Sequence, residues 1–414
     1  MNTVKRGNMR AYKRLLNYVT VNTTSHEEVE KTPSGEGEFA LAHLLAEEMK
    51  ALGLTDVRVD EHAYVYGFLP ATPGCEGCRP VGFISHLDTV DDCGGTDTRP
   101  QLIPDYDGGP IALGTSGRIL DPEAFPHLNE CRGKTILTTD GTSVLGADDK
   151  AGIAEIMTMC ERLVSEKRPH GRICVCFTPD EEIGHGAAYL DIDAFGAEFA
   201  YTVDGSAPNE VEYETFNAAA AHLTAHGLSV HPGDAKGRMV NAMKVLMEFD
   251  GMLPPDEVPE KTEGREGFYH LTDAGGNVTE AAADYILRDH DAEKFARRKQ
   301  MIRETAEALN QKYGAGTVDC QIKDQYRNMA EVMTRHPEVV EIAKRAVRAV
   351  GLTPVSRPVR GGTDGAQLSF RGLPCPNLGT GGYAYHGYYE HAVAEEMDQC
   401  VDILLEVVKA IAEK

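Results

Sequence analysis

The stretch Val81-Gly-Phe-Ile-Ser-His-Leu-Asp88 decides the fold class. Its first five residues are mostly apolar and do not alternate with polar ones, which is typical of a short strand buried on both faces. Two similar runs, Ile173–Phe177 and Phe199–Val203, follow along the chain. Segments with helical spacing of apolar residues lie beside them, clearest in Gly37–Leu52 and in the segment that begins at Asp148. Strands alternating with helices predict an α/β sheet covered by helices on both faces.

A different pattern occupies residues 215–327. It predicts a strand, a helix, two strands around the turn Gly275-Gly-Asn277, a long helix and a final strand. This β-α-β-β-α-β order is that of a ferredoxin-like α+β unit. Because the α/β pattern then returns, we expect a discontinuous first domain, residues 1–214 and 328–414, with a mixed, mostly parallel sheet interrupted by a compact inserted domain.

Composition excludes several classes of partner. The 414 residues carry a formal net charge of -24, whereas nucleic acids and anionic membranes attract basic surfaces. No run of about 18 apolar residues occurs that could span a bilayer as a helix. The basic start, Met1–Leu16, is not followed by the apolar region of a secretory signal. We therefore expect a cytoplasmic protein that binds neither nucleic acid nor membrane.

The ten cysteines are scattered, as free thiols in a reducing compartment are. One pair with CxxC spacing, Cys75 and Cys78, lies in a Gly/Pro-rich turn between two predicted strands. A lone CxxC motif with no helix start beside it is weak support for a metal or redox function. A hairpin loop at the surface is the expected alternative.

Acidic and histidine side chains lie where the predicted strands end. His86, Glu181, Glu182 and Asp204 each follow a strand, at the edge where open α/β sheets bind their ligands. Asp148 begins the neighbouring helix. Taken singly, each has an ordinary explanation as a surface residue or helix cap, but their common position favours a shared site.

Together with His386 in a C-terminal loop, His86, Asp148, Glu182 and Asp204 supply two imidazoles and three carboxylates. This donor set suits two divalent ions, with one carboxylate bridging them. Such a pair activates water and polarises a carbonyl, so hydrolysis of an amide is the expected reaction. Glu181 is then the candidate general base, and Asp88 can accept the second ring N–H of His86.

Six motifs carry a resemblance to metallopeptidase family M20. They occur in the family's order: His86-Leu-Asp-Thr-Val, Gly146-Ala-Asp-Asp-Lys-Ala-Gly, Thr178-Pro-Asp-Glu-Glu-Ile-Gly, Tyr201-Thr-Val-Asp-Gly, His231-Pro-Gly and His386-Gly-Tyr-Tyr-Glu. The resemblance covers essentially the whole chain and is closest to the family's tripeptide aminopeptidases. It implies a dinuclear zinc enzyme, with cobalt or manganese as possible substitutes, that releases the N-terminal residue of a tripeptide.

The resemblance also assigns the metal ligands. His86 and Asp204 are expected to bind the first ion, Glu182 and His386 the second, and Asp148 both. Glu181 would be the base, with Asp88 supporting His86. An aspartate at position 204 is similar to the aminopeptidase members of the family.

The inserted domain resembles the family's lid and dimerisation domain, which implies a homodimer. Within it, His231 is expected to stabilise the oxyanion, in its own or the partner's site, and Asn241 to touch the substrate. Arg288 and, outside the insertion, Arg360 resemble a pair that binds the peptide's C-terminal carboxylate.

Two alternatives stay open. One keeps the metal site and acts as a dipeptidase or as a deacylase of N-acyl amino acids. The other is a catalytically silent binding protein, which would be expected to lack a ligand or the base, and none is missing here.

Overall fold

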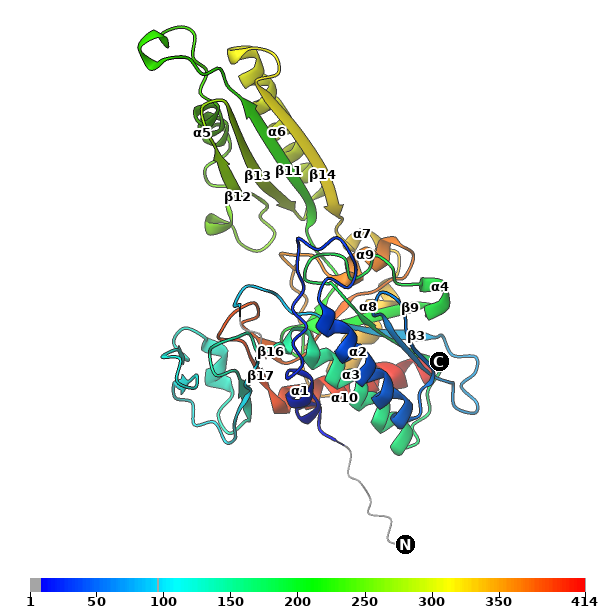
Figure 1. Cartoon of the computed structure of the whole chain (residues 1–414). Helices are drawn as coiled ribbons and strands as arrows, with labels where there is room; N and C mark the ends of the chain where they lie inside the picture. Colours follow the sequence, from blue (N-terminus) through cyan, green and yellow to red (C-terminus); the bar gives the residue numbers. More distant parts are fainter. Residues whose placement is uncertain (1–8, 95–96, 414) are drawn as a thin grey trace. The chain divides into compact units, whose positions relative to one another are not determined.

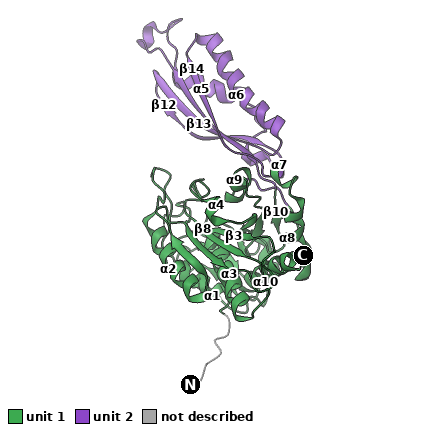
Figure 2. Ribbon diagram, turned by 90° about the vertical axis from the view of Figure 1, so that its right-hand side faces the viewer, with its two compact units in different colours: residues 1–213, 331–356, 363–414 green, residues 214–330, 357–362 purple. Residues whose placement is uncertain are grey.

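The computed structural model describes residues 9–94 and 97–413, and the chain divides into two compact units (Figures 1 and 2). Unit 1 takes in the described parts of Met1–Tyr213, Glu331–Ser356 and Thr363–Lys414, and unit 2 consists of Glu214–Ala330 and Arg357–Gly362. The place of Arg357–Gly362 in the chain predicts that this segment belongs to the first domain. It belongs with unit 2 because the Val359 N–H donates to the carbonyl of Glu214 and the Phe216 N–H to that of Gly361.

The large sheet of unit 1 has the order β1-β2-β8-β3-β9-β15-β10. Strands β8, β3, β9 and β15 are parallel neighbours, and the outer pairs are antiparallel. Strand β1 is antiparallel to β2, and β2 is antiparallel to β8, so β1 runs in the same direction as β8. Most strands of the sheet therefore run in one direction, which confirms the predicted mixed, mostly parallel sheet. The bounds are β1 (Thr55–Val59), β2 (Val65–Leu69), β3 (Val81–His86), β8 (Ile173–Thr178), β9 (Phe199–Gly205), β10 (Val211–Glu212) and β15 (Asn377–Gly379).

Helices cover both faces of this sheet, as predicted (Figure 2). One layer packs against side chains such as Phe83 and Tyr201, and the Tyr201 hydroxyl donates to the carbonyl of Val339. On the other face, Phe195 packs against Gly82. The first layer contains α1 (Ala11–Tyr18), α2 (Glu36–Leu52), α3 (Ala147–Ser165), α8 (Pro337–Ala349) and α10 (Ala394–Ala412), and the second α4 (Ile192–Phe195) and α9 (Asp364–Phe370).

A smaller sheet in unit 1, with the order β16-β17-β7-β4, was not predicted. Its strands have two or three residues each, too few for a periodic pattern to appear. It contains β4 (Gln101–Ile103), β7 (Ile136–Thr138), β16 (Gly382–Tyr383) and β17 (His391–Val393), and beside it lie the pair β5 (Ile111–Ala112) and β6 (Ile119–Leu120) and the 3-10 turn η1 (Pro126–Glu130).

Unit 2 has the predicted β-α-β-β-α-β order, with an antiparallel sheet of order β12-β13-β11-β14. This is the ferredoxin-like arrangement, and its core lies between one sheet face and two helices, around buried residues such as Leu223, Phe249 and Leu287. The elements are β11 (Asn217–His226), η2 (Pro232–Asp234), α5 (Ala242–Met252), η3 (Pro259–Lys261), β12 (Phe268–Gly276), β13 (Glu280–Asp289), α6 (Ala292–Tyr313) and β14 (Val318–Tyr326); α7 (Ala330–Met333) follows them.

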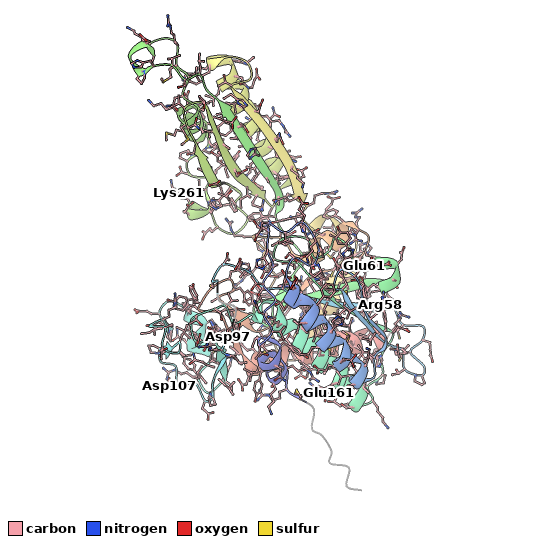
Figure 3. All side chains as sticks on the ribbon, in the orientation of Figure 1. Arg58, Glu61, Asp97, Asp107, Glu161 and Lys261 are labelled. Carbon is pink, nitrogen blue, oxygen red and sulfur yellow. The ribbon has the colours of Figure 1, made fainter. Side chains whose placement is uncertain are left out.

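Charged side chains cover the surface. Asp97, Asp107 and Lys261, labelled in Figure 3, are exposed. Of the helices in the described part of the chain, none is both long and apolar enough to cross a membrane.

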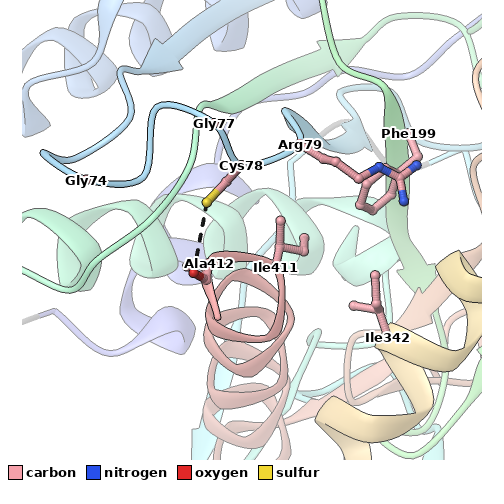
Figure 4. Close-up of a pocket in the computed structure, with 8 residues that line it drawn as sticks. All are labelled: Gly74, Gly77, Cys78, Arg79, Phe199, Ile342, Ile411 and Ala412. Atoms are coloured by element: carbon pink, nitrogen blue, oxygen red, sulfur yellow. Dashed lines mark hydrogen bonds between the residues drawn. The ribbon is translucent and has the colours of Figure 1, made fainter. Parts of the chain in front are cut away.

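The turn between β2 and β3 is not a hairpin, because β8 lies between these strands and pairs with both. In this turn Cys75 is buried and Cys78 partly exposed, and all ten thiols, each within the described residues, are free. The Cys78 thiol contacts the carbonyl of Ala412 at 3.9 Å (Figure 4).

Candidate metal centre

Three neighbouring strands of the large sheet end at the candidate metal centre. His86 is the last residue of β3, and Asp204 lies near the end of the adjacent β9. Glu182 follows β8, the strand on the other side of β3. Because these strands are parallel, their carboxyl ends lie at one edge of the sheet. That edge therefore brings together an imidazole and two carboxylates.

His86, Asp148 and Asp204 form a first group that could hold a metal ion. Nε2 of His86 lies 3.0 Å from Oδ1 of Asp148 and 3.6 Å from Oδ1 of Asp204. The three side chains are only 2%, 13% and 11% exposed. The group is thus screened from bulk water on most sides.

Asp148, Glu182 and His386 form a second group. Nε2 of His386 lies 3.3 Å from Oδ2 of Asp148 and 3.1 Å from Oε2 of Glu182. His386 has a left-handed backbone conformation with φ of 58°, which costs a non-glycine residue free energy. Asp148 belongs to both groups and presents a different carboxylate oxygen to each histidine.

The spacing of these atoms fits small divalent ions. In a tetrahedral site with metal–ligand bonds of about 2.0–2.2 Å, adjacent ligand atoms lie roughly 3.3–3.6 Å apart. Two of the four imidazole–carboxylate separations, 3.3 and 3.6 Å, fall within this range, and the other two, 3.0 and 3.1 Å, are slightly shorter. In addition, Oε1 of Glu182 is buried without a hydrogen-bond partner among the described residues, which is costly unless another group satisfies it. The residues present therefore fit a pair of metal ions.

The electrostatics of the site also favour cations. Burial raises the pKa of Glu182 and of Asp204 to about 7 in each case, because their charged forms are poorly solvated and lie near Asp148. Hydrogen bonds to Asp148 and Glu182 raise the pKa of His386 to about 11. Protons thus compete for Glu182 and Asp204, whereas, despite its burial, hydrogen bonds with His386 and His86 keep the pKa of Asp148 below its usual value. Bound metal ions can take over the neutralisation of these carboxylates.

Asp88 is fully buried beside His86. Nδ1 of His86 lies 3.0 Å from the backbone carbonyl of Asp88 and 3.3 Å from its Oδ1, so the carbonyl is the closer acceptor for the ring N–H. The Asp88 carboxylate instead accepts the backbone N–H groups of Glu181 and Glu182, at 2.9 and 3.1 Å. Asp88 therefore contacts both the imidazole and the loop that carries the two glutamates.

Glu181 lies beside the metal-binding groups. Burial raises its pKa well above the usual value for a glutamate. A carboxyl group with a raised pKa is a stronger proton acceptor when ionised, which suits a general base.

Two buried carboxylates hold the segment around Asp148, and sequence reasoning gave them no role. Glu390 accepts the N–H groups of Gly146 and Asp148, at 2.8 and 3.0 Å. Asp149 accepts the N–H of His86 at 3.1 Å. In the sequence, the feature that indicates a role for Glu390 is its position in the same loop as His386.

The other predicted site residues lie in unit 2. His231 accepts the Gly233 N–H through Nδ1 at 3.1 Å and is exposed. Asn241 caps α5 by accepting the Lys244 N–H at 3.4 Å. Both have a local structural role, and Nε2 of His231 has no hydrogen-bond partner among the residues that the structure describes.

Arg288 and Arg360 lie at the same end of the unit 2 sheet. Arg288 is paired across the strands with Phe268, and the Arg360 guanidinium lies 5.5 Å from the Phe268 ring centroid. Arg360 donates to the carbonyls of Gly264 and Glu266, at 3.1 and 2.8 Å. Burial lowers the pKa of Arg288, whose guanidinium stays cationic at neutral pH. Both guanidinium groups thus lie over aromatic rings, Arg288 over Tyr326 and Arg360 over Phe216 and Phe268.

A third group, His127, Cys131 and Glu396, also has metal-ligating atoms close together. Its carboxylate is already satisfied, because Oε1 of Glu396 binds Lys134 at 2.7 Å and Oε2 accepts the Tyr383 hydroxyl at 2.5 Å. This group therefore has a stable hydrogen-bonded arrangement without an ion.

A pocket of unit 1 lies between the turn around Cys78 and the end of α10 (Figure 4). Its lining is mainly apolar, with Phe199, Ile342 and Ile411, and the one charged lining residue, Arg79, is paired with Glu198 at 2.8 Å. It contains no member of the carboxylate–imidazole groups and is a less suitable place for hydrolysis.

Comparison with known proteins identifies the class. The sequence model of peptidase family M20/M25/M40 matches residues 145–410. The chain is also 48% identical over 407 residues to peptidase T of Clostridium perfringens strain 13, covering 98% of this chain and 100% of that relative. The chain therefore belongs to peptidase family M20/M25/M40, a class of peptidases, and within it to the group of enzymes called peptidase T.

Solved structures share the fold. Aminopeptidase PepT from Bacillus cereus ATCC 10987 has a TM-score of 0.77 at 23% identity, covering 98% of this chain and 99% of that chain. A tripeptidase from Staphylococcus aureus subsp. aureus Mu50 also has a TM-score of 0.77, at 21% identity and with 99% of both chains covered.

Proposed function

We propose that this chain is an aminopeptidase that removes the N-terminal residue of tripeptides with the help of two divalent metal ions. We expect these ions to be zinc. The observation that carries the proposal is the position of Asp148, whose two carboxylate oxygens face two different histidines. A single carboxylate shared in this way is suited to bridging two ions. The names of its relatives, peptidase T, aminopeptidase PepT and tripeptidase, supply the substrate class.

His86 and Asp204 would hold one ion, Glu182 and His386 the other, and Asp148 both. Two bound ions would supply Lewis acidity at the scissile carbonyl and would lower the pKa of a water molecule. Glu181 would accept a proton from the attacking water and pass it to the leaving amine. The Asp88 carboxylate keeps Glu181 in place by accepting the backbone N–H of Glu181.

The remaining assignments concern the substrate. Arg288 and Arg360 would bind the free carboxylate of the peptide, because guanidinium groups pair with carboxylates through two parallel hydrogen bonds. His231 would donate a hydrogen bond to the developing oxyanion, and Asn241 would contact the peptide backbone. Recognition of both peptide ends selects for length rather than for side chain.

We also propose a homodimer in the cytoplasm. Ten free thiols support a reducing compartment. The oligomeric state is tested by measuring the mass of the purified protein in solution by light scattering.

The function is tested with four substrates, a tripeptide, the matching dipeptide and tetrapeptide, and the N-acetylated tripeptide, each with and without a chelator. Preferred, chelator-sensitive release of the N-terminal residue from the free tripeptide is the expected result. Faster turnover of the dipeptide would favour a dipeptidase instead. Equal turnover of the acetylated peptide would rule out recognition of a free amino terminus and favour a deacylase.

A further inference from the structure

Three consecutive backbone N–H groups in the loop after β8 all donate to buried carboxylates. The Asp180 N–H donates to Oε2 of Glu38 at 3.1 Å. The next two, of Glu181 and Glu182, donate to the two oxygens of Asp88 at 2.9 and 3.1 Å. Glu38 and Asp88 are both fully buried, so these hydrogen bonds do not compete with bulk water.

Asp180 is held from its side chain as well. Its carboxylate accepts the Ser34 N–H at 2.9 Å and the Ser34 hydroxyl at 2.6 Å. Its backbone has a left-handed conformation with φ of 54°, which an aspartate adopts at a cost that surrounding contacts must offset. The segment from Ser34 to Glu38 therefore fixes the residue that directly precedes Glu181.

Glu38 connects this loop to a rigid helix. Its other oxygen, Oε1, accepts the Gly35 N–H at 3.1 Å and closes the first turn of α2. Further along α2, Leu41, Leu45 and Met49 are completely buried. A single carboxylate thus ties the start of a packed helix to the loop that carries the candidate base, although Glu38 and Asp180 are 142 positions apart.

We infer that Glu38 is a positioning residue for Glu181. Glu38 accepts the Asp180 N–H and thereby keeps the backbone just before Glu181 in one conformation. Asp88 accepts the next two backbone N–H groups, those of Glu181 and Glu182. This inference rests on the proposed function only where it concerns Glu181 as the base. Glu38 does not bind the amide of the metal ligand Glu182, so its loss should disturb proton transfer more than metal binding.

The experiment compares Glu38→Ala, Glu38→Gln and the control Glu36→Ala, which alters an exposed acid in the same turn of α2. For Glu38→Ala we expect kcat for a tripeptide to fall roughly 10- to 100-fold, as for other supporting residues of metal sites. KM and the metal content per chain should stay unchanged. Glu38→Gln keeps one carbonyl acceptor for the Asp180 N–H and should recover part of the rate, and Glu36→Ala should behave as wild type.

A second measurement does not depend on activity. Hydrogen–deuterium exchange of a peptide covering residues 179–183 should be faster in Glu38→Ala than in wild type or Glu36→Ala. Unchanged exchange in that peptide would overturn the inference, as would a rate loss matched by an equal loss of metal. If exchange is faster but the wild-type enzyme cleaves no tripeptide, the proposed function fails while the positioning of the loop by Glu38 stands.

Discussion

Oε1 of Glu390 accepts the backbone N–H of Asp148 at 3.0 Å, and both residues lie in segments that contain proposed metal ligands. Glu390 is 1% exposed, so this hydrogen bond fixes the position of Asp148 from inside the protein. Replacing Glu390 with Ala should weaken metal binding by roughly 10- to 100-fold, the usual effect of losing a supporting group. Titration with a competing chelator measures this change. An unchanged metal affinity would show that Asp148 is held without Glu390.

Asp148 and Asp204 should differ in their effect on metal content. Asp148→Ala removes a ligand from both groups and should leave less than one tightly bound ion per chain. Asp204→Ala affects the first group only and should leave one. Metal analysis of the dialysed variants gives the two numbers. Equal losses in the two variants would contradict the assignment of Asp148 as the shared ligand.

Glu181→Gln should keep both metals and lose most of the activity, because an amide cannot accept the proton of the water. The expected fall in kcat is about 100- to 10,000-fold, the range for a general base. The necessary control is metal content equal to that of the wild type. Normal turnover by this variant would assign proton transfer to another group.

Metal affinity should increase as the pH rises from 6 to 8. Burial raises the pKa of Glu182 and of Asp204 to about 7 in the metal-free protein, so below that pH both carboxyl groups carry protons that must leave before a metal binds. Protonation therefore competes with the ions, and the apparent dissociation constant should rise as pH falls from 8 to 6. Calorimetric titration at several pH values checks this sign. A dissociation constant that does not change over this interval would contradict it.

Arg288→Ala should reduce kcat/KM for a tripeptide with a free carboxylate by roughly 10- to 100-fold, since hydrogen bonds to charged groups contribute about 1.5–3 kcal/mol. The same variant should cleave a tripeptide with a C-terminal amide at nearly the wild-type rate. Arg297→Ala is a suitable control, because Arg297 is exposed and pairs with Glu304. Equal losses on the acid and the amide would indicate that Arg288 only supports the unit 2 sheet.

The large elements of the fold could be predicted because their patterns are local. The buried strand that ends at His86 and the β-α-β-β-α-β order of unit 2 both follow from periodicity over a few residues. That the acidic and histidine side chains at strand ends would lie close together could be predicted in the same way, because the topology of an α/β sheet determines where those ends meet.

The contacts that hold the site could not be predicted. Glu38 and Asp180 are 142 positions apart, and Gly146 and Glu390 are 244 apart. A glutamate in the first turn of a helix is expected to cap that helix, and Glu38 does so, but a local pattern cannot reveal its second partner. The small sheet of unit 1 was missed because its strands are too short to show alternation.

The contact between Asp148 and His386 also has a consequence for biosynthesis. Asp148 is made well before unit 2, and His386 well after it, because Glu214–Ala330 lies between them in the chain. All residues of the first group have been made once Asp204 has left the ribosome, but Glu390, which holds Asp148, and Asn377, which accepts the Asp204 N–H, come only with the C-terminal segment, as does His386 of the second group. A chain that stops before residue 386 therefore lacks one of the proposed ligands, so under the proposed function hydrolytic activity should appear only near the completion of synthesis.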